Sequence, residues 1–188
     1  MKPRVLLVFS PRFEESASML KGIAHYARVH HPWSFFLDEK TRAETDATWL
    51  RSQKWDGVIS RHTTPALAKS CAQMKIPLVD LNDTAPFPGV PKIRPDNAAM
   101  GRLGAGHLME RGFRALGFNG YENELWSCER RDGFVGAVQQ ADQKCEVLDV
   151  AHPGDSTPAW EASQIAVISR WLRRLPRPAA VMAMAISS

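Results

Sequence analysis

The sequence predicts an α/β protein of two lobes, each a doubly wound parallel sheet with helices packed on it. Short apolar runs rich in β-branched and aromatic residues recur along the 188 residues, and segments with apolar residues at helical spacing lie between them. Strands that alternate with helices in this way form parallel sheets. A loop rich in proline at 82–95 interrupts the series, which then restarts. We therefore expect a first lobe at 1–112, including a connecting helix, and a second lobe at 113–188.

The first lobe contains four predicted strands. Val5–Phe9 is a continuous apolar run, which is typical of a strand buried on both faces. A helix from Glu14 to His30 follows, because Leu20, Ile23, Ala24 and Ala27 fall on one stripe. Proline at its first turn favours a helix over Pro65–Met74. The other expected elements are strands at 33–37, 57–60 and 77–80 and a helical segment at 43–53.

The second series begins with a helix whose N-cap is Asp96 and which ends near Arg111, where Gly112 can terminate it. Its predicted inward face carries Met100, Leu103, Gly104 and Leu108. Two later helices are expected at 127–141, with Phe134, Ala137, Val138 and Ala141 inward, and at 158–175, with Ile165, Ile168, Leu172 and Leu175 inward. Strands are expected at 115–118, 145–150 and 179–184. With only about three strands and little chain after the last one, this lobe is expected to be incomplete.

Composition and motifs exclude several classes of protein. Lys and Arg number 24 against 20 Asp and Glu, and they are scattered rather than clustered as in a nucleic-acid-binding tail. The N-terminus lacks the pattern of a signal peptide and no apolar run is long enough to span a bilayer, so a cytoplasmic protein is expected. The three cysteines are widely spaced and suit neither a disulfide framework nor a zinc site.

Catalytic and cofactor motifs are also missing. The segment after the first strand, Ser10–Ser16, contains no glycine-rich phosphate loop. We find no GxSxG, no HExxH and no histidine or cysteine spacing suited to a metal. The sequence therefore predicts a protein that is not an enzyme and that uses no cofactor and no metal.

Polar and aromatic residues follow the predicted strands, at the edge where open parallel sheets bind ligands. Carboxylates, amides and guanidinium groups can bond paired sugar hydroxyls, and aromatic rings can stack on the C–H faces of a sugar. Strand-end loops are commonly polar, which is the simpler explanation for any one of these residues. The residues are Ser10, Arg12, Phe13, Arg61, His62, Asp80, Asn82, Asn119 and Tyr121.

Two positions are stronger candidates for ligand contact. Asp96 starts the connecting helix, and Arg130 is expected in the first turn of the helix that follows Trp126, so that both would face a cleft between the lobes. A cation in the first turn of a helix is unfavourable because the helix macrodipole is positive at that end, and Arg131 is placed in the same way. This suggests that at least one of the two arginines is held there for a reason other than helix stability. Pairing of both arginines with Glu129 is the alternative explanation.

The same positions carry a family resemblance. Pro95-Asp96-Asn97 with Gly101, and the segment from His107 to Arg114, are similar to the lobe-crossing segment of lactose/purine repressor-type sensor domains. The helix start from Trp126 to Phe134 resembles that of the xylose operon regulators within this group, and segments 22–27 and 55–59 also fit them. The resemblance extends over essentially the whole chain.

The resemblance implies a periplasmic-binding-protein-like fold of type I in which Asp96 and Arg130 contact a monosaccharide such as D-xylose and Trp126 borders it. It also implies a homodimer and operator DNA bound through a module outside this chain, since xylose regulators carry an AraC-type DNA-binding domain after the sensor. The chain departs from the pattern at Ala185-Ile186, where the family usually presents an Asn-Asp-type ligand contact, so the chain looks truncated. The alternatives are a sugar-binding protein for transport and an enzyme of flavodoxin-like or phosphosugar-isomerase type.

Overall fold

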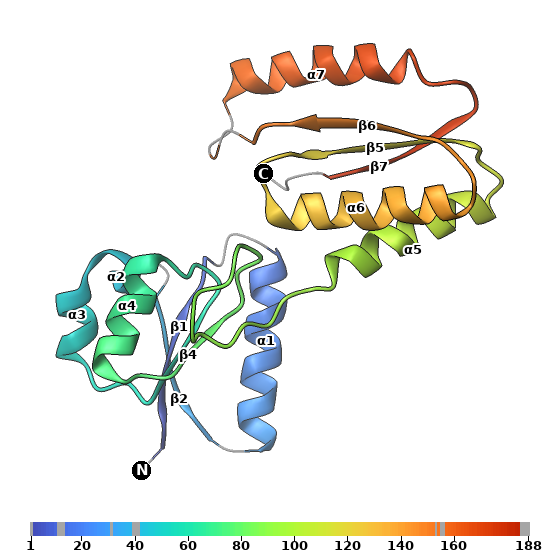
Figure 1. Ribbon diagram of the computed structural model, residues 1–188. Helices are drawn as coiled ribbons and strands as arrows, with labels where there is room; N and C mark the ends of the chain where they lie inside the picture. Colours follow the sequence, from blue (N-terminus) through green and yellow to red (C-terminus); the bar gives the residue numbers. More distant parts are fainter. Residues whose placement is uncertain are drawn as a thin grey trace. The chain divides into compact units, whose positions relative to one another are not determined.

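A computed structural model describes residues 2–10, 14–30, 32–38, 42–152, 154 and 157–184. The chain divides into two compact units, Met1–Arg94 and Pro95–Ser188. Each unit has its own parallel sheet with helices on both faces, as Figure 1 shows. The prediction of an α/β protein with two parallel sheets is confirmed.

The sheet of the first unit has the strand order β2-β1-β3-β4, and every neighbouring pair is parallel. Side chains of β1 alternate between two cores: Leu6 and Val8 face one side of the sheet, and Val5 and Leu7 face the other. This alternation explains why the strand is a continuous apolar run. The strands are β1 (Arg4–Val8), β2 (Ser34–Leu37), β3 (Gly57–Ser60) and β4 (Leu78–Asp80).

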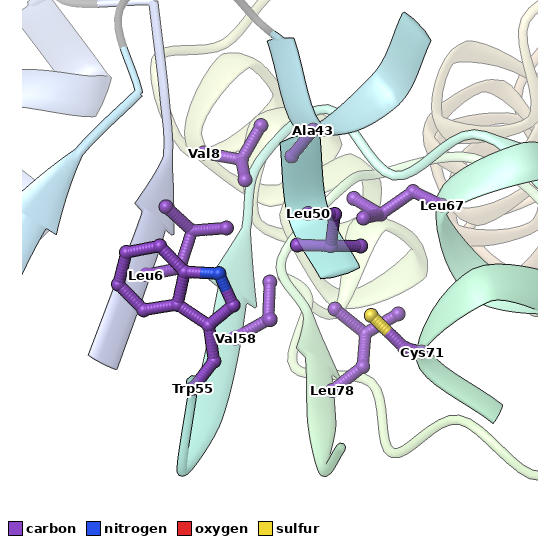
Figure 2. Packing of buried hydrophobic residues seen from close by; sticks show 9 residues of the cluster. All are labelled: Leu6, Val8, Ala43, Leu50, Trp55, Val58, Leu67, Cys71 and Leu78. Atoms are coloured by element: carbon purple, nitrogen blue, oxygen red, sulfur yellow. The ribbon is translucent and has the colours of Figure 1, made fainter. Parts of the chain in front are cut away.

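Helices cover both faces of this sheet (Figure 1). The larger core brings Leu6, Val8 and Val58 against the shorter helices, and Figure 2 shows the nine side chains of that cluster. The segment predicted as one helix at 43–53 is two helices, because Asp46 caps the second by accepting a hydrogen bond from Trp49 N at 2.9 Å. The helices are α1 (Glu14–Val29) on one face and α2 (Arg42–Thr45), α3 (Ala47–Ser52) and α4 (Pro65–Met74) on the other.

The second unit is a parallel sheet of order β6-β5-β7 with α7 on one face and α5 and α6 on the other (Figure 1). Leu116 and Phe118 of β5 pack with Phe134 and Val138 of α6, and all four are buried. The elements are α5 (Asn97–Glu110), β5 (Ala115–Tyr121), α6 (Leu125–Gln140), β6 (Cys145–Val150), α7 (Pro158–Leu172) and β7 (Ala179–Ala183).

The connecting helix α5 belongs to the second unit. The boundary expected at residue 112 differs from the observed division after Arg94. The physical reason is tight packing of α5 on α6: a Cβ built at Gly101 would lie 2.0 Å from Arg130 O, and one built at Gly133 would lie 2.1 Å from Ala98 O. Only glycine allows two helix backbones to approach this closely.

The predicted inward face of α6 is correct for Phe134, Ala137 and Val138, but Ala141 follows the end of the helix and is exposed. The predicted inward faces of α5 and α7 are partly wrong. Leu103 of α5 is 73 % exposed, and the buried residues of this helix are Asn97, Gly101 and Ala105. Ile165 of α7 is 67 % exposed, whereas the ring of Trp171 lies against Gly117 of the sheet. In both helices small or amphipathic residues face the sheet or the neighbouring helix, so apolar periodicity selected the wrong stripe. Within the described residues, no helix combines the length and apolarity needed to cross a membrane.

Candidate functional site

Asp96 caps helix α5 as predicted. Its Oδ1 accepts a hydrogen bond from Ala99 N at 2.8 Å, which satisfies one of the unpaired amides of the first turn. The other carboxylate oxygen lies 3.9 Å from Nη2 of Arg102, and the side chain is 70 % exposed. The carboxylate therefore remains able to accept further hydrogen bonds from a ligand.

Arg130 is held by contacts from three directions within the second unit. Its Nε donates to Oδ1 of Asn97 at 2.8 Å, and its Nη1 lies 3.7 Å from Sδ of Met184. The guanidinium carbon lies over the ring of Trp126, 4.9 Å from the centroid, in a cation–π contact. Asn97 is the residue next to Asp96 in sequence, so the start of α5, Arg130 and Trp126 form one continuous cluster.

Helix α6 begins at Leu125 rather than at Ser127, which corrects one step of the sequence argument. Arg130 therefore lies beyond the first turn, where the macrodipole has little effect on a charge. The pairing of both arginines with Glu129 is also not what the structure shows. Glu129 Oε2 accepts from Asn97 Nδ2 at 3.3 Å, and Arg131 instead donates to Asp149 of β6 at 2.5 Å.

Arg131 is a structural residue of the second unit. Its hydrogen bonds with Asp149 and then with Asp132 raise the pKa of the guanidinium, so it stays charged at any accessible pH. The bond to Asp149 joins α6 to β6 and fixes the helix on its sheet. Of the two adjacent arginines, only Arg130 belongs to the candidate ligand cluster.

Asn119 lies inside strand β5, which corrects the expectation that it follows the strand. β5 continues to Tyr121, because Asn119, Gly120 and Tyr121 pair with residues of β6. Asn119 Nδ2 donates to Leu148 O at 2.9 Å, so part of its amide is used in joining the two strands.

The remaining candidates belong to the first unit. Arg61 follows β3, and its Nη1 donates to Oδ1 of Asn82 at 3.1 Å, while Nη2 lies 3.5 Å from the carboxylate of Glu15. The structure therefore brings Arg61 and Asn82 together at the carboxyl edge of the sheet, as expected. Arg12 and Phe13 lie outside the described residues.

The same edge holds a buried ion pair that the sequence did not reveal. Lys92 Nζ lies 2.7 Å from Asp80 Oδ2, and Asp80 Oδ1 accepts from Thr63 Oγ1 at 2.7 Å. The side chains of Lys92 and Asp80 are 9 % and 1 % exposed. The pair joins β4 to the returning loop, where Lys92 forms an isolated bridge with Asp80. Asp80, one of the polar strand-end residues, therefore has a mainly structural environment.

His62, the residue before Thr63, lies in an environment that disfavours its charged form. Burial, and to a lesser extent the positive charge of Arg61, lower the pKa of the imidazole. Its Nε2 is buried, and no described residue bonds it. The ring is therefore neutral near pH 7.

No metal site emerges from the part of the chain that the structure describes. That part contains no group of three or more histidine, cysteine, aspartate or glutamate side chains that could hold a metal ion. The clusters found are guanidinium, amide, carboxylate and indole groups. Such groups bind neutral hydroxyl-bearing molecules through hydrogen bonds and stacking.

Comparison with known proteins identifies relatives over nearly the whole chain. Residues 6–185 match the family described as periplasmic binding proteins and sugar binding domain of LacI family. A xylose operon regulatory protein of Haemophilus influenzae is 22 % identical over 189 residues, which cover 96 % of this chain and 48 % of that protein. The chain thus spans about half the length of the curated relative it matches.

Solved structures share the fold. A periplasmic binding protein/LacI transcriptional regulator from Alkaliphilus metalliredigens, complexed with D-xylulofuranose, superposes with a TM-score of 0.64 at 18 % identity, over 99 % of this chain and 79 % of that one. A regulatory protein of the LacI family from Chloroflexus aggregans superposes with a TM-score of 0.71 at 17 % identity, over 96 % of this chain and 68 % of that one. These similarities confirm the periplasmic-binding-protein-like fold.

Proposed function

Since the chain belongs to the family of periplasmic binding proteins and sugar-binding domains of LacI regulators, we propose that it is the sugar-sensing part of a bacterial transcription regulator that responds to xylose or a related pentose. The family supports a sugar ligand. The choice of a pentose is supported by the xylose operon regulatory protein among the relatives and by the xylulofuranose-bound neighbour.

The observation that carries the proposal is the arrangement around Arg130. Its guanidinium is oriented by Asn97 and lies on the indole of Trp126, and Asp96 holds an exposed carboxylate one residue before Asn97. A guanidinium donates to two neighbouring hydroxyl oxygens at once, and a carboxylate accepts from hydroxyl hydrogens. Together these groups supply both halves of the hydrogen bonding that a pentose needs.

The proposed activity is binding rather than catalysis. Sugar would favour one conformation of the sensor, and the effect on DNA affinity can be no larger than the sugar's preference for that conformation. In the proposed regulator, a separate module contacts the operator DNA, and the regulator acts in the cytoplasm as a homodimer. Cell fractionation tests the location: recovery from the periplasm would favour a transport-binding protein instead. Turnover of a sugar phosphate by the purified chain would favour an enzyme.

Calorimetric titration of the purified chain with D-xylose and a panel of other pentoses and hexoses tests the ligand. We expect saturable binding of a pentose and a loss of about 100-fold or more in affinity for R130A, since it removes a hydrogen-bonded cation. The matched control is R170A, which removes an exposed arginine from α7. R130A with unchanged affinity, or a folded chain that binds none of these sugars, would overturn the proposal.

A further inference from the structure

We infer that Asn97 is a positioning residue for ligand binding: it fixes the guanidinium of Arg130 before the ligand arrives. The inference rests on the proposed function, because it concerns how the sugar-binding arginine is prepared. Asn97 is the first residue of α5 and is 1 % exposed, so it is a buried polar side chain in a place where polar groups need partners.

The amide of Asn97 uses its two ends for different purposes. Nδ2 donates to Oε2 of Glu129 at 3.3 Å, and Oδ1 accepts from Nε of Arg130 at 2.8 Å. The carboxylate of Glu129 can only accept, so it requires the NH₂ end of the amide on its side. That requirement turns the carbonyl oxygen toward Arg130. Glu129 thereby sets the orientation of the amide, and the amide sets the orientation of the guanidinium.

The bond at Nε has a particular effect on an arginine. Nε lies in the guanidinium plane at the stem of the fork, so an acceptor placed there limits rotation of the plane while the Nη groups remain the outer donors. The ring of Trp126 on one face of the guanidinium opposes tilting. With the plane and the tilt both set, less conformational entropy is lost when a ligand binds.

The close approach of α5 and α6 makes this contact possible. Asn97 and Arg130 lie on different helices, 33 residues apart, and the backbones meet at Gly101 and Gly133. A Cβ at either glycine would overlap backbone atoms of the other helix. A larger separation would remove Oδ1 of Asn97 from hydrogen-bonding distance of Nε.

A double-mutant cycle in sugar affinity tests the inference. We expect N97A to weaken pentose binding by roughly tenfold, the scale of immobilising one long side chain. The same substitution in the R130K background should have little further effect, because lysine has no Nε for Asn97 to hold. N97D combined with E129Q should restore affinity relative to N97A, since the acceptor returns without a repelling carboxylate.

A stability control separates positioning from damage to the fold. Thr157 is the N-cap of α7, and its Oγ1 accepts a hydrogen bond from Trp160 N at 3.2 Å. T157A removes this bond and so destabilises the same unit without changing the contacts of Arg130. We expect it to lower the unfolding temperature and leave sugar affinity unchanged. If N97A weakens binding equally in the wild-type and R130K backgrounds, or if T157A weakens it as much as N97A, Asn97 has no positioning role.

A measurement without ligand distinguishes this inference from the proposed function. The Nε–H resonance of Arg130 in a ¹⁵N spectrum is identified by its loss in R130K, and it should exchange slowly with water in the wild-type chain and rapidly in N97A. A wild-type chain with the protected resonance that binds no sugar would overturn the sugar proposal but not the contact between Asn97 and Arg130. An equally rapid exchange in both chains would overturn the inference, whatever the ligand.

Discussion

Replacing Gly101 by alanine should separate the two helices that hold Arg130. The added Cβ would lie 2.0 Å from Arg130 O and 2.7 Å from Phe134 N, whereas ordinary contacts begin at 3.4 Å. Both obstructing atoms are backbone, so no side-chain rotation can relieve the overlap. Overpacking of this kind costs roughly 1–3 kcal/mol and sometimes more, and we expect a net loss of at least about 2 kcal/mol in the free energy of unfolding.

The same helix offers a matched control of opposite sign. A Cβ built at Gly106 meets no atom within 4 Å, so G106A should stabilise the chain by about 0.5–1 kcal/mol through helix propensity. On α6, Gly133 and Gly136 offer a second matched pair for the same test. A Cβ built at Gly133 would lie 2.1 Å from Ala98 O, whereas one built at Gly136 would meet no atom within 4 Å.

Urea unfolding followed by circular dichroism measures these differences. We expect G101A and G106A to differ by about 3 kcal/mol, with G101A the less stable. Sugar titration of G101A should also show weaker binding, because the obstructing carbonyl belongs to Arg130 itself. Equal stability of the two variants, or greater stability of G101A, would refute the argument that the helix crossing requires glycine.

Three further predictions concern the first unit and its buried groups. K92M should lower the free energy of unfolding by about 3–5 kcal/mol, because it leaves the buried carboxylate of Asp80 without its cation. The control R102M removes a partner of an exposed ion pair and should lower it by less than about 1 kcal/mol. Similar losses for the two variants in urea unfolding would contradict this prediction. The pKa of His62 is lowered in the folded chain, so as pH falls through the ordinary histidine value of 6.5 the unfolded chain binds the proton first and the folded chain loses stability. H62Q should therefore show a smaller fall in unfolding temperature over that pH range. Identical pH profiles for H62Q and the wild-type chain would contradict a lowered pKa for His62. Burial raises the pKa of the Cys71 thiol to about 11, so iodoacetamide at about pH 8 should modify it only after unfolding, and rapid labelling of the native chain would show otherwise.

Local signals in the sequence were sufficient for many, but not all, elements of the fold. The helix predicted over Pro65–Met74 has those bounds, because Thr64 and Pro65 start it with a cap and a preset φ angle. Asp96 caps α5 as expected. Such features depend on neighbouring residues, which the sequence displays directly.

Only one contact of the candidate site follows from a local pattern. Trp126 and Arg130 are four residues apart on one helix, so their proximity follows from helix geometry. The bond between Asn97 and Arg130 requires a particular helix crossing, and the environment of Asn119 requires the register of β5 with β6. The one signal in the sequence for this helix crossing was a glycine inside each helix, Gly101 in α5 and Gly133 in α6, because a glycine inside a helix can mark a close approach of another backbone.

The faces of α5 and α7 show a second limit of pattern reading. Leu103 and Ile165 were expected inside because they are large and apolar, yet both are largely exposed. Gly101 and Ala105 occupy the helix contact because their small size, rather than their apolarity, allows it. Hydrophobic periodicity records the apolarity of a residue and not its size.

The division of the chain after Arg94 has a consequence for how such a sensor could be recombined. The arginine, the indole beneath it, the amide that holds it and the carboxylate at the helix start all lie in one uninterrupted half of the polypeptide, beginning at Pro95. A hybrid gene joined at this point to a first half from a related regulator would inherit Arg130 together with Trp126, Asn97 and Asp96. Changes in sugar preference between such hybrids would then report on the contribution of the first unit, Met1–Arg94.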